Sequence, residues 1–361
     1  MSQNQRKKIY INGKFLAQKL SGVQRYAIEI VKAMDKLLAD KNYEVILLTP
    51  KVTMRQLKLK HVTITACGYL QGTLWEQLEL PFYAKGGALV NLCNCAPLLK
   101  ENQMVTIHDA AVMAVPAAYG FFYRCWHHFM GYVLGKCLPL IITDSKFSRQ
   151  ELQKYLHIPV EKIHVVYLGA DHMESIEPDE SIIAKLGLKE RKYVLAVSSQ
   201  SIHKNFQLVL QAASLMTETT FVIVGQSNSS VFKNASLVMA SDNVIFTGYI
   251  DDGKLAALYK HACCFVYPSL YEGFGLPPLE AMAFGTPVIS SQTASLPEVL
   301  GEGVLYIDPY RIEDMAEAIA KMISNRALRD RLMEKGREQY RQYDWDNTAQ
   351  KIMERMVGLI C

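Results

Sequence analysis

The chain has 361 residues, half of them apolar and a fifth charged; this composition is ordinary for globular proteins, and the length predicts two domains. The formal net charge of +4 is too small to indicate a nucleic-acid partner, but it is compatible with anionic ligands or a weakly anionic surface. No apolar run reaches the length of about eighteen residues that a membrane-spanning helix needs, and the eight cysteines include no C-x-x-C pair, so we expect reduced thiols in a cytoplasmic protein.

Short apolar runs alternate with segments of helical spacing in the first half of the chain. The alternation predicts a parallel, doubly wound sheet. Helical spacing is clear from Val23 to Leu38, and residues 73–83 predict a helix that ends at Pro81. Asp144 and Ser145 are expected to cap a further helix. The predicted strands of this half are 8–12, 43–48, 62–65, 88–93, 104–107, 140–143 and 162–167.

Two residues of the first half follow predicted strands at positions where ligands bind. Gly22 lies between the first strand and its helix, which favours an anion site, with plain helix entry as the alternative. His108 comes directly after strand 104–107, at the carboxyl edge of the sheet where open parallel sheets bind ligands. A structural hydrogen bond is the alternative for this histidine.

Residues 119–138 are rich in aromatic and basic side chains. Such a segment can form an amphipathic surface that touches lipid. Packing on the sheet is the alternative, and the three glycines Gly120, Gly131 and Gly135 argue against a pure membrane helix.

The second half repeats the alternation. Lys204 lies near a helix start after strand 193–197 and is a credible partner for a diphosphate, whereas His203 could add charge only if protonated. Further strands are predicted at 220–224, 244–247 and 263–267, and the segments 288–290, 295–299 and 304–307 are expected to complete the sheet. Helices are predicted from Phe206 and over 251–261, 312–323, 326–340 and 347–359.

The stretch Tyr267–Phe284 predicts a strand, a glycine loop and a helix that opens at Leu279, with proline at or near its first turn. Glycine amides and the positive end of a helix suit a phosphate. Glu272 precedes the loop, and Glu280 is expected in the first helical turn. Carboxylates repel phosphate but accept hydrogen bonds from vicinal hydroxyls, so the pattern predicts sugar rings on both sides of a diphosphate. A solvated Glu272 and a dipole-favouring Glu280 are the alternative.

Residues 272–281 read EGFGLPPLEA and closely resemble the signature of glycosyltransferase family 4, in which seven residues separate two glutamates. The resemblance implies that Glu272 holds hydroxyls of the donor sugar and Glu280 holds the donor ribose. It also implies that the backbone of Gly273, Phe274, Gly275 and Leu276 meets the sugar and the diphosphate.

The resemblance covers essentially the whole chain and assigns further donor contacts. Gly22, in the run GVQRY, would let the backbone approach the donor phosphates or the acceptor, and His108 would contact the donor sugar near its anomeric centre or primary hydroxyl. Ser199 and Lys204 are the expected contacts after strand 193–197, and the turn at Tyr249 would meet the base. The family frequently has arginine where His203 stands, so the usual two-cation clamp is in doubt.

The resemblance implies an α/β protein of the GT-B fold, with two Rossmann-like doubly wound domains facing across a cleft. Residues 1–171 would form the acceptor side, with 347–361 packing back on it, and residues 172–346 would bind the nucleotide sugar. The implied activity is retaining hexosyl transfer, with His108, Glu272 and Lys204 as catalytic residues and no essential metal or other cofactor. The D-x-D run that ends at Asp346 follows no strand, so we interpret Asp346 as a helix cap.

The N-terminal half resembles bacterial surface-polysaccharide mannosyl- and rhamnosyltransferases, which favours GDP-mannose, a lipid-linked saccharide acceptor and peripheral contact with the cytoplasmic face of the inner membrane. Transferases that use UDP sugars or dTDP-rhamnose are alternatives. A nucleotide-sugar 2-epimerase and an inactive sugar-nucleotide-binding protein stay open. A dinucleotide-dependent oxidoreductase is disfavoured because Gly273-Phe274-Gly275 continues to Pro278 rather than to a third glycine.

Overall fold

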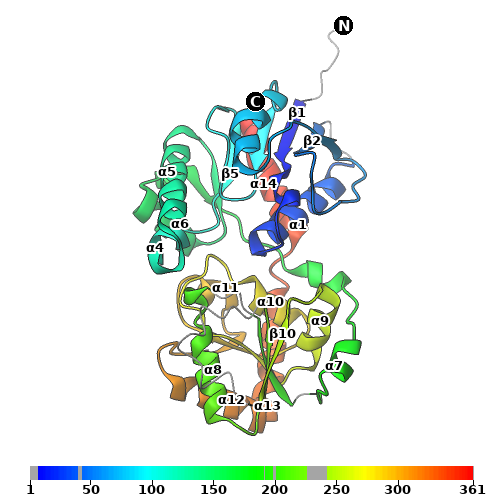
Figure 1. The fold of residues 1–361 in the computed structure, drawn as a ribbon, viewed down its shortest axis with the longest axis vertical. Coiled ribbons are helices and arrows are strands. Elements are labelled where there is room, and N and C mark those ends of the chain that lie inside the picture. The colour runs from blue at the N-terminus through cyan, green and yellow to red at the C-terminus, as the bar shows by residue number, and fades with distance from the viewer. Residues whose placement is uncertain (1–6, 40–42, 191, 198–200, 226–241, 361) are drawn as a thin grey trace. The chain divides into compact units, whose positions relative to one another are not determined.

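The computed structural model describes residues 7–39, 43–190, 192–197, 201–225 and 242–360. The chain divides into two compact units (Figure 1). Unit 1 comprises Met1–Gly169 and Asp344–Cys361, and unit 2 comprises Ala170–Tyr343. Each unit is a parallel sheet with helices on its faces.

Unit 1 contains a seven-stranded parallel sheet in the order β3-β2-β1-β4-β5-β6-β7. Ile9 at its centre pairs with Val45 on one side and with Ala88 on the other. The chain therefore changes direction across the sheet between β1 and β4, and the predicted doubly wound sheet is confirmed. The strands are β1 Lys7–Asn12, β2 Tyr43–Thr49, β3 Thr63–Ala66, β4 Ala88–Asn91, β5 Gln103–Thr106, β6 Ile141–Thr143 and β7 Ile163–Val165.

The predicted helical range 73–83 is confirmed, but the prediction that Pro81 ends the helix was wrong, because helical structure continues to Tyr83. Its middle is a π-helical turn, in which the Leu80 N–H bonds to the Trp75 carbonyl. The wider turn places Pro81 in the first turn of a new segment, where its missing N–H leaves no bond unmade. The main helices of unit 1 are α1 Gly22–Leu37, α2 Gly72–Leu74, η2 Trp75–Glu79, α3 Leu80–Tyr83, α4 Ala111–Ala114, α5 Phe121–Cys137, α6 Lys146–Leu156 and α14 Trp345–Ile360.

The last helix, α14, packs against α1 within unit 1. The Trp345 ring lies edge-on to Tyr26 of α1, with ring centres 6.0 Å apart. Asp346 does not cap this helix, contrary to the sequence interpretation. The helix begins at Trp345, and the Asp344 carboxylate accepts the Asn347 N–H at 2.6 Å. Because a cap must precede the first helical residue, Asp344 takes that role.

Unit 2 contains a six-stranded parallel sheet in the order β10-β9-β8-β11-β12-β13. β8 is the switch point, with Val194 paired to Phe221 on one side and to Cys264 on the other. The segment 295–299 does not extend the sheet as expected. It forms most of helix α11, with Pro297 in the first turn. The strands are β8 Tyr193–Val197, β9 Thr220–Val224, β10 Val244–Gly248, β11 Cys264–Tyr267, β12 Val288–Ser291 and β13 Val304–Ile307.

Alternate residues of the unit 2 strands face different helices, as period-2 geometry requires. Cys264 and Val266 share a core with α8 and α12, whereas the Phe265 ring packs edge-on to Tyr259 of α9 at 5.4 Å. Helices therefore cover both faces of the sheet, as Figure 1 shows. They are η5 Asp171–Ser175, α7 Ser181–Lys185, η6 Ile202–Lys204, α8 Phe206–Leu215, α9 Asp252–His261, α10 Leu276–Ala283, α11 Leu296–Leu300, α12 Ile312–Ser324 and α13 Arg326–Tyr340.

Candidate active site

The entrance to helix α10 forms the centre of the candidate site in unit 2. Gly275 precedes the helix in the left-handed conformation, with φ of 103°, which favours glycine. The helix begins at Leu276, three residues earlier than predicted. Pro277 and Pro278 lie in its first turn, which confirms the expectation of proline there, because that turn needs no intrahelical N–H donors. The two prolines also remove two first-turn amides, so an anion here would meet the amides of residues 273–276 and the helix dipole.

Glu272 and Lys204 form an ion pair. The Lys204 Nζ lies 2.6 and 2.7 Å from the two carboxylate oxygens and 3.1 Å from the Tyr267 hydroxyl. An ammonium group has three N–H donors, and these contacts use all three. Glu272 is buried, with 8% of its surface exposed.

The electrostatics of this pair favour its charged form. Burial alone would raise the pKa of Glu272, but the Lys204 ammonium lowers that pKa below its usual range. Burial alone would likewise lower the pKa of Lys204, and the Glu272 carboxylate raises it well above the ordinary value. Both groups are therefore ionised at neutral pH, and Lys204 cancels the charge of Glu272.

Glu280 is the fifth residue of α10 and so lies in the second turn, not in the first turn as predicted. Its carboxylate accepts a hydrogen bond from the Tyr259 hydroxyl at 3.2 Å and lies 3.3 Å from Nε2 of His172. Burial, followed by the Glu280 charge, raises the pKa of Tyr259 well above its usual range, so this phenol stays a donor. Glu280 thus has side-chain partners from two other elements and does not serve merely as a charge at the helix start.

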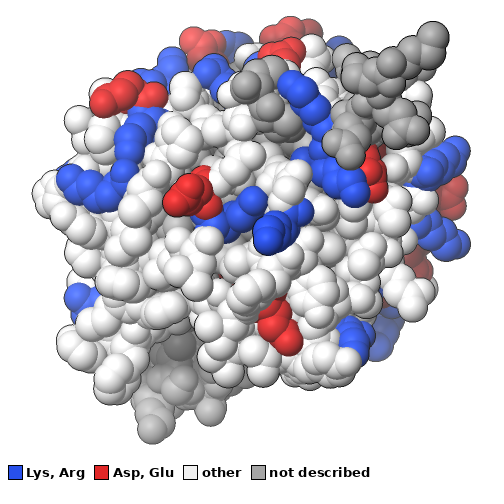
Figure 2. Space-filling model, turned by 90° about the horizontal axis from the view of Figure 1, so that it is seen from above, with Lys and Arg blue, Asp and Glu red and all other residues white. Residues whose placement is uncertain are grey.

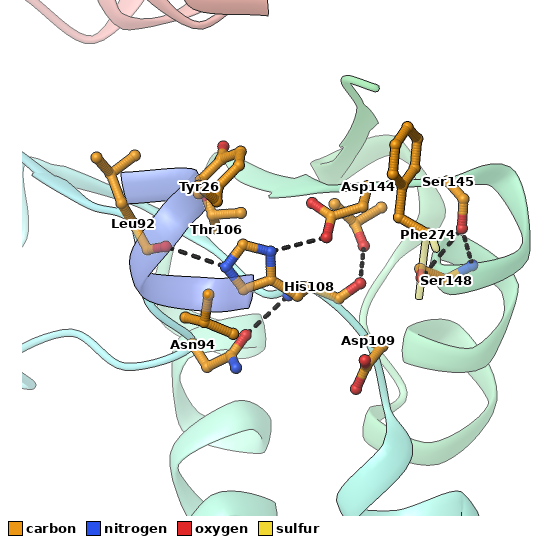
Figure 3. A network of polar contacts seen from close by, with 12 residues as sticks. Tyr26, Leu92, Asn94, Thr106, His108, Asp109, Asp144, Ser145, Ser148 and Phe274 are labelled. Atoms are coloured by element: carbon orange, nitrogen blue, oxygen red, sulfur yellow. Dashed lines mark hydrogen bonds and ion pairs between the residues drawn. The ribbon is translucent and has the colours of Figure 1, made fainter. Parts of the chain in front are cut away.

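His108 is buried in unit 1, with both ring nitrogens facing acceptors (Figure 3). Nδ1 lies 2.7 Å from a carboxylate oxygen of Asp144, and Nε2 lies 3.1 Å from the Leu92 carbonyl. Two acceptors call for two N–H donors, which only the imidazolium has. Burial would lower the pKa of His108, but the Asp144 charge and its hydrogen bond raise it. We therefore infer that His108 is a buried cation, with Tyr26 edge-on to its ring at 4.7 Å.

Asp144 is a site residue that sequence reasoning missed, because it was expected to cap α6. Of the two predicted caps only Ser145 is confirmed, since its hydroxyl accepts the Ser148 N–H at 3.0 Å. Asp144 is 3% exposed, and its Oδ1 has no hydrogen-bond partner among the described residues. A signal was available: Asp144 directly follows β6, as His108 comes just after β5, and these strands are neighbours.

Comparisons with known proteins show the family of the chain. A family model described as glycosyl transferases group 1 matches residues 178–339. The O-antigen chain mannosyltransferase B of Escherichia coli is 30% identical over 268 residues, which cover 70% of this chain and 69% of that protein. The chain belongs to the group 1 glycosyltransferases.

Solved structures show the fold of this glycosyltransferase. The sucrose-phosphate synthase of Thermosynechococcus elongatus superposes with a TM-score of 0.78 at 20% identity, over 98% of this chain and 99% of that one. Anabaena HepE, in complex with UDP and glucose, gives a TM-score of 0.74 at 16% identity, over the same shares of the two chains. The predicted GT-B fold is thereby confirmed.

The other residues predicted to contact the donor, Gly22, Tyr249 and Ser199, lie in different surroundings. Gly22 is the first residue of α1, one turn before Tyr26, and an added Cβ there would meet no atom within 4 Å. Tyr249 follows β10 and is 70% exposed. Ser199 lies outside the described residues. Gly22 and His108 belong to unit 1, whereas Lys204, Glu272 and Glu280 are gathered in unit 2.

His203 does not supply the missing second cation. Its ring is buried, with Nδ1 2.7 Å from the Ser201 hydroxyl. Burial and the neighbouring Lys204 charge lower the pKa of His203 to about 4, so it is neutral near pH 7. Among the residues that the structure describes, no group of three or more His, Cys, Asp or Glu side chains could hold a metal ion.

Proposed function

We propose that this glycosyltransferase moves a hexosyl unit from a nucleotide diphosphate sugar to a hydroxyl of a saccharide acceptor, with retention of anomeric configuration as in family 4. GDP-mannose is the first candidate donor, because the E. coli relative is named an O-antigen chain mannosyltransferase. A UDP sugar is the second, because HepE was solved with UDP and glucose. The O-antigen name also supports a role in surface-polysaccharide synthesis. The proposal includes a lipid-linked acceptor, reached at the cytoplasmic face of the inner membrane.

The geometry around α10 carries the proposal. Glu272 and Glu280 flank the turn into the helix, where the amides of residues 273–276 and the helix dipole would stabilise the charge that develops on the departing diphosphate. Glu272 would accept hydroxyls of the donor sugar, and Glu280 would accept the ribose hydroxyls. Because Lys204 cancels the charge of Glu272, a carboxylate can lie beside an anionic leaving group without strong repulsion.

Retention would proceed without a covalent sugar–enzyme intermediate. Glu272 is the carboxylate closest in sequence to the glycine loop, but both of its oxygens accept hydrogen bonds from Lys204, which makes it a poor nucleophile. We therefore favour attack on the same face of the sugar, with the departing diphosphate as the base. His108 would contact the donor sugar through Nε2, and a sugar hydroxyl would then have to take the place of the Leu92 carbonyl, because both ring N–H groups already face acceptors. Backbone dipoles and Lys204 would replace an essential metal.

The donor is tested first. GDP, UDP, dTDP and ADP, and sugars carrying each of them, are screened by thermal shift, and each binder is incubated with and without an oligosaccharide acceptor. Transfer that requires the acceptor and preserves the anomeric configuration supports the proposal. A changed donor sugar without acceptor would indicate an epimerase, and binding without any product would indicate an inactive sugar-nucleotide-binding protein.

The role of Glu272 is tested by Glu272→Gln. We expect turnover to fall by a factor on the order of 10² to 10³, with little loss of nucleotide affinity, because the lost contact is to the reacting sugar. Glu302→Gln is the matched control, since Glu302 is an exposed glutamate of unit 2 that is also paired with a lysine. A small, equal effect of both substitutions on turnover would contradict the assigned role.

A further inference from the structure

Large apolar side chains gather on the surface of helix α5 in unit 1. Phe122 is 87% exposed, Phe121 is 68% exposed and Phe129 is 50% exposed. Tyr123, Trp126 and Tyr132 are also exposed. Scattered apolar side chains are normal on protein surfaces, but six aromatic rings on one 17-residue helix form a patch of the kind that marks an interaction site.

The opposite face of α5 fixes the helix to unit 1. Met130 and Leu134 are buried in a core shared with α6. Gly131 and Gly135 permit a close approach: an added Cβ would lie 2.7 Å from a Leu156 methyl at Gly131 and 2.4 Å from Ile158 Cγ1 at Gly135. Two of the three glycines that argued against a membrane helix therefore serve the inner face, and the exposed aromatic side chains take no part in this core.

Charge on this segment is of one sign. Residues 110–143 contain no Asp or Glu, whereas α5 carries Arg124 and Lys136. The Lys136 ammonium lies 5.6 Å from the centre of the exposed Tyr132 ring, so positive charge and aromatic surface occur together. On the face of the molecule that Figure 2 shows, uncharged side chains cover much of the area between scattered charged side chains of both signs.

We propose that the outer face of α5 docks unit 1 onto the surface of an anionic lipid bilayer, with the helix lying in the headgroup layer. At about 1.5 Å per residue the helix would present some 25 Å of aromatic surface to the lipid. Trp and Tyr favour the headgroup region, and flanking Arg and Lys are attracted to anionic lipids. Within the described ranges no helix is long and apolar enough to cross a bilayer, so the contact is peripheral.

A bilayer suits this surface better than the same surface of a second copy does. Interaction with a second copy would need an acidic complement to Arg124 and Lys136, and this face supplies none, because residues 110–143 lack acidic side chains. The inference deepens the proposed function, since it names the surface that would bring the transferase to a lipid-linked acceptor, but it does not depend on which sugar is moved.

Tryptophan fluorescence tests the contact directly. Trp75 and Trp345 are buried, and Trp126 on α5 is the remaining tryptophan of the chain. We expect a blue shift of the emission when the full chain is mixed with vesicles of phosphatidylcholine and phosphatidylglycerol, and a weaker shift with phosphatidylcholine alone or at high salt. No shift with any vesicle, or equal binding to both vesicle types, would overturn the inference.

Substitutions locate the contact on α5. Phe122→Ser with Phe129→Ser is expected to reduce co-sedimentation with the anionic vesicles at least about tenfold, because two exposed rings no longer enter the lipid. Tyr310→Ser, which removes a 77% exposed ring in unit 2, is the matched control and should bind as the unsubstituted chain does. Both proteins are first compared by circular dichroism and by nucleotide affinity, which the α5 substitutions should leave unchanged.

Other outcomes separate this inference from the proposed function. Undiminished vesicle binding by the Phe122/Phe129 variant would overturn the inference, as would a lipid-free dimer that this variant abolishes. Transfer to a soluble acceptor without any vesicle binding would overturn the inference and leave the proposed function intact. Vesicle binding without transfer to any acceptor would support the inference and count against the transferase function.

Discussion

Breaking the ion pair between Lys204 and Glu272 should destabilise unit 2 by a predictable amount. Lys204→Met leaves a buried carboxylate without its counter-ion, and Glu272→Gln leaves an ammonium without one. Removing one partner of a buried pair typically costs about 3–5 kcal/mol. Because 19% of the Lys204 side chain and 10% of the Glu272 side chain remain exposed to water, we expect the lower end, about 3 kcal/mol, for either substitution.

The double variant separates this electrostatic effect from lost packing. With both charges removed no uncompensated ion is buried, so the combined loss should be smaller than the sum of the single losses by about 2 kcal/mol. Urea unfolding followed by far-UV circular dichroism measures these free energies. Trp75, Trp126 and Trp345, the three tryptophans of the chain, all belong to unit 1. The shift should therefore be larger by circular dichroism than by tryptophan fluorescence.

The exposed pair Lys260–Glu180, also in unit 2, is the matched control. Its Nζ–O distance is 2.8 Å, but both side chains are about half exposed, so Lys260→Met and Glu180→Gln should each cost less than about 1 kcal/mol. If Lys204→Met or Glu272→Gln cost no more than these controls, the reasoning about a buried, mutually dependent pair would be refuted.

The pair also has a defined pH window. The pKa of Glu272 is lowered from its ordinary value of 4.5, so its contribution is present above that pH and is lost as pH falls through the folded-state value. The pKa of Lys204 is raised from 10.5, so its contribution is present below that pH and is lost as pH rises through the folded-state value. We therefore expect the coupling to be constant between pH 4.5 and 10.5.

Three further predictions concern single residues. Glu280→Ala should weaken nucleotide binding about tenfold by calorimetry while turnover at saturating donor changes less; equal losses in both would contradict a ribose contact. Asp144→Asn removes the charge that raises the pKa of His108. In the unsubstituted chain the raised pKa stabilises unit 1 below the ordinary value of 6.5, and this stabilisation is lost as pH rises through the raised value. Asp144→Asn should abolish this pH dependence of the free energy of unfolding, measured by tryptophan fluorescence. An unchanged pH profile would argue against the pair. Asp344→Ala should cost about 1 kcal/mol in the same assay and Asp346→Ala less, because Asp344 caps α14; the reverse order would restore the original assignment.

The sheets could be predicted from sequence because buried parallel strands read as short apolar runs, as at 104–107 and 193–197. The errors gather at prolines. Pro81 was taken to end a helix. Proline was expected at or near the first turn of the helix opening at Leu279, but the boundary was placed three residues late, after Pro277 and Pro278. All three prolines lie in the first turns of helical segments. A proline in a first helical turn and a proline in a loop satisfy the same local rule, so the sequence does not separate them.

Individual site residues were easier to predict than their partners. Glu272 and Lys204 were named from the motif and from a helix start, but 68 positions separate them, and their contact depends on β8 and β11 being neighbours in the sheet. His108 and Asp144 meet in the same way across β5 and β6, which are also adjacent. Strand order is a property of the whole unit, so patterns along the chain give the residues and not the pairs.

Because Lys204 and Glu272 are paired, the contact of Glu272 with the donor sugar and the contact of Lys204 with the diphosphate differ in what each must displace. A carboxylate has about four lone-pair positions, and Lys204 occupies two. Hydrogen bonds from the Ser269 and Tyr267 hydroxyls also lower the pKa of Glu272, so sugar hydroxyls would compete with these hydroxyls and not with Lys204. Lys204 has no N–H left: a phosphate oxygen must displace a carboxylate oxygen or the Tyr267 hydroxyl. The leaving diphosphate would then depend first on the amides of residues 273–276, since Pro277 and Pro278 donate nothing. Lys204 would bind the diphosphate only if this contact compensated for the weakened hydrogen bond to Glu272. That condition is met more readily in the transition state, as the diphosphate departs, than in the bound donor.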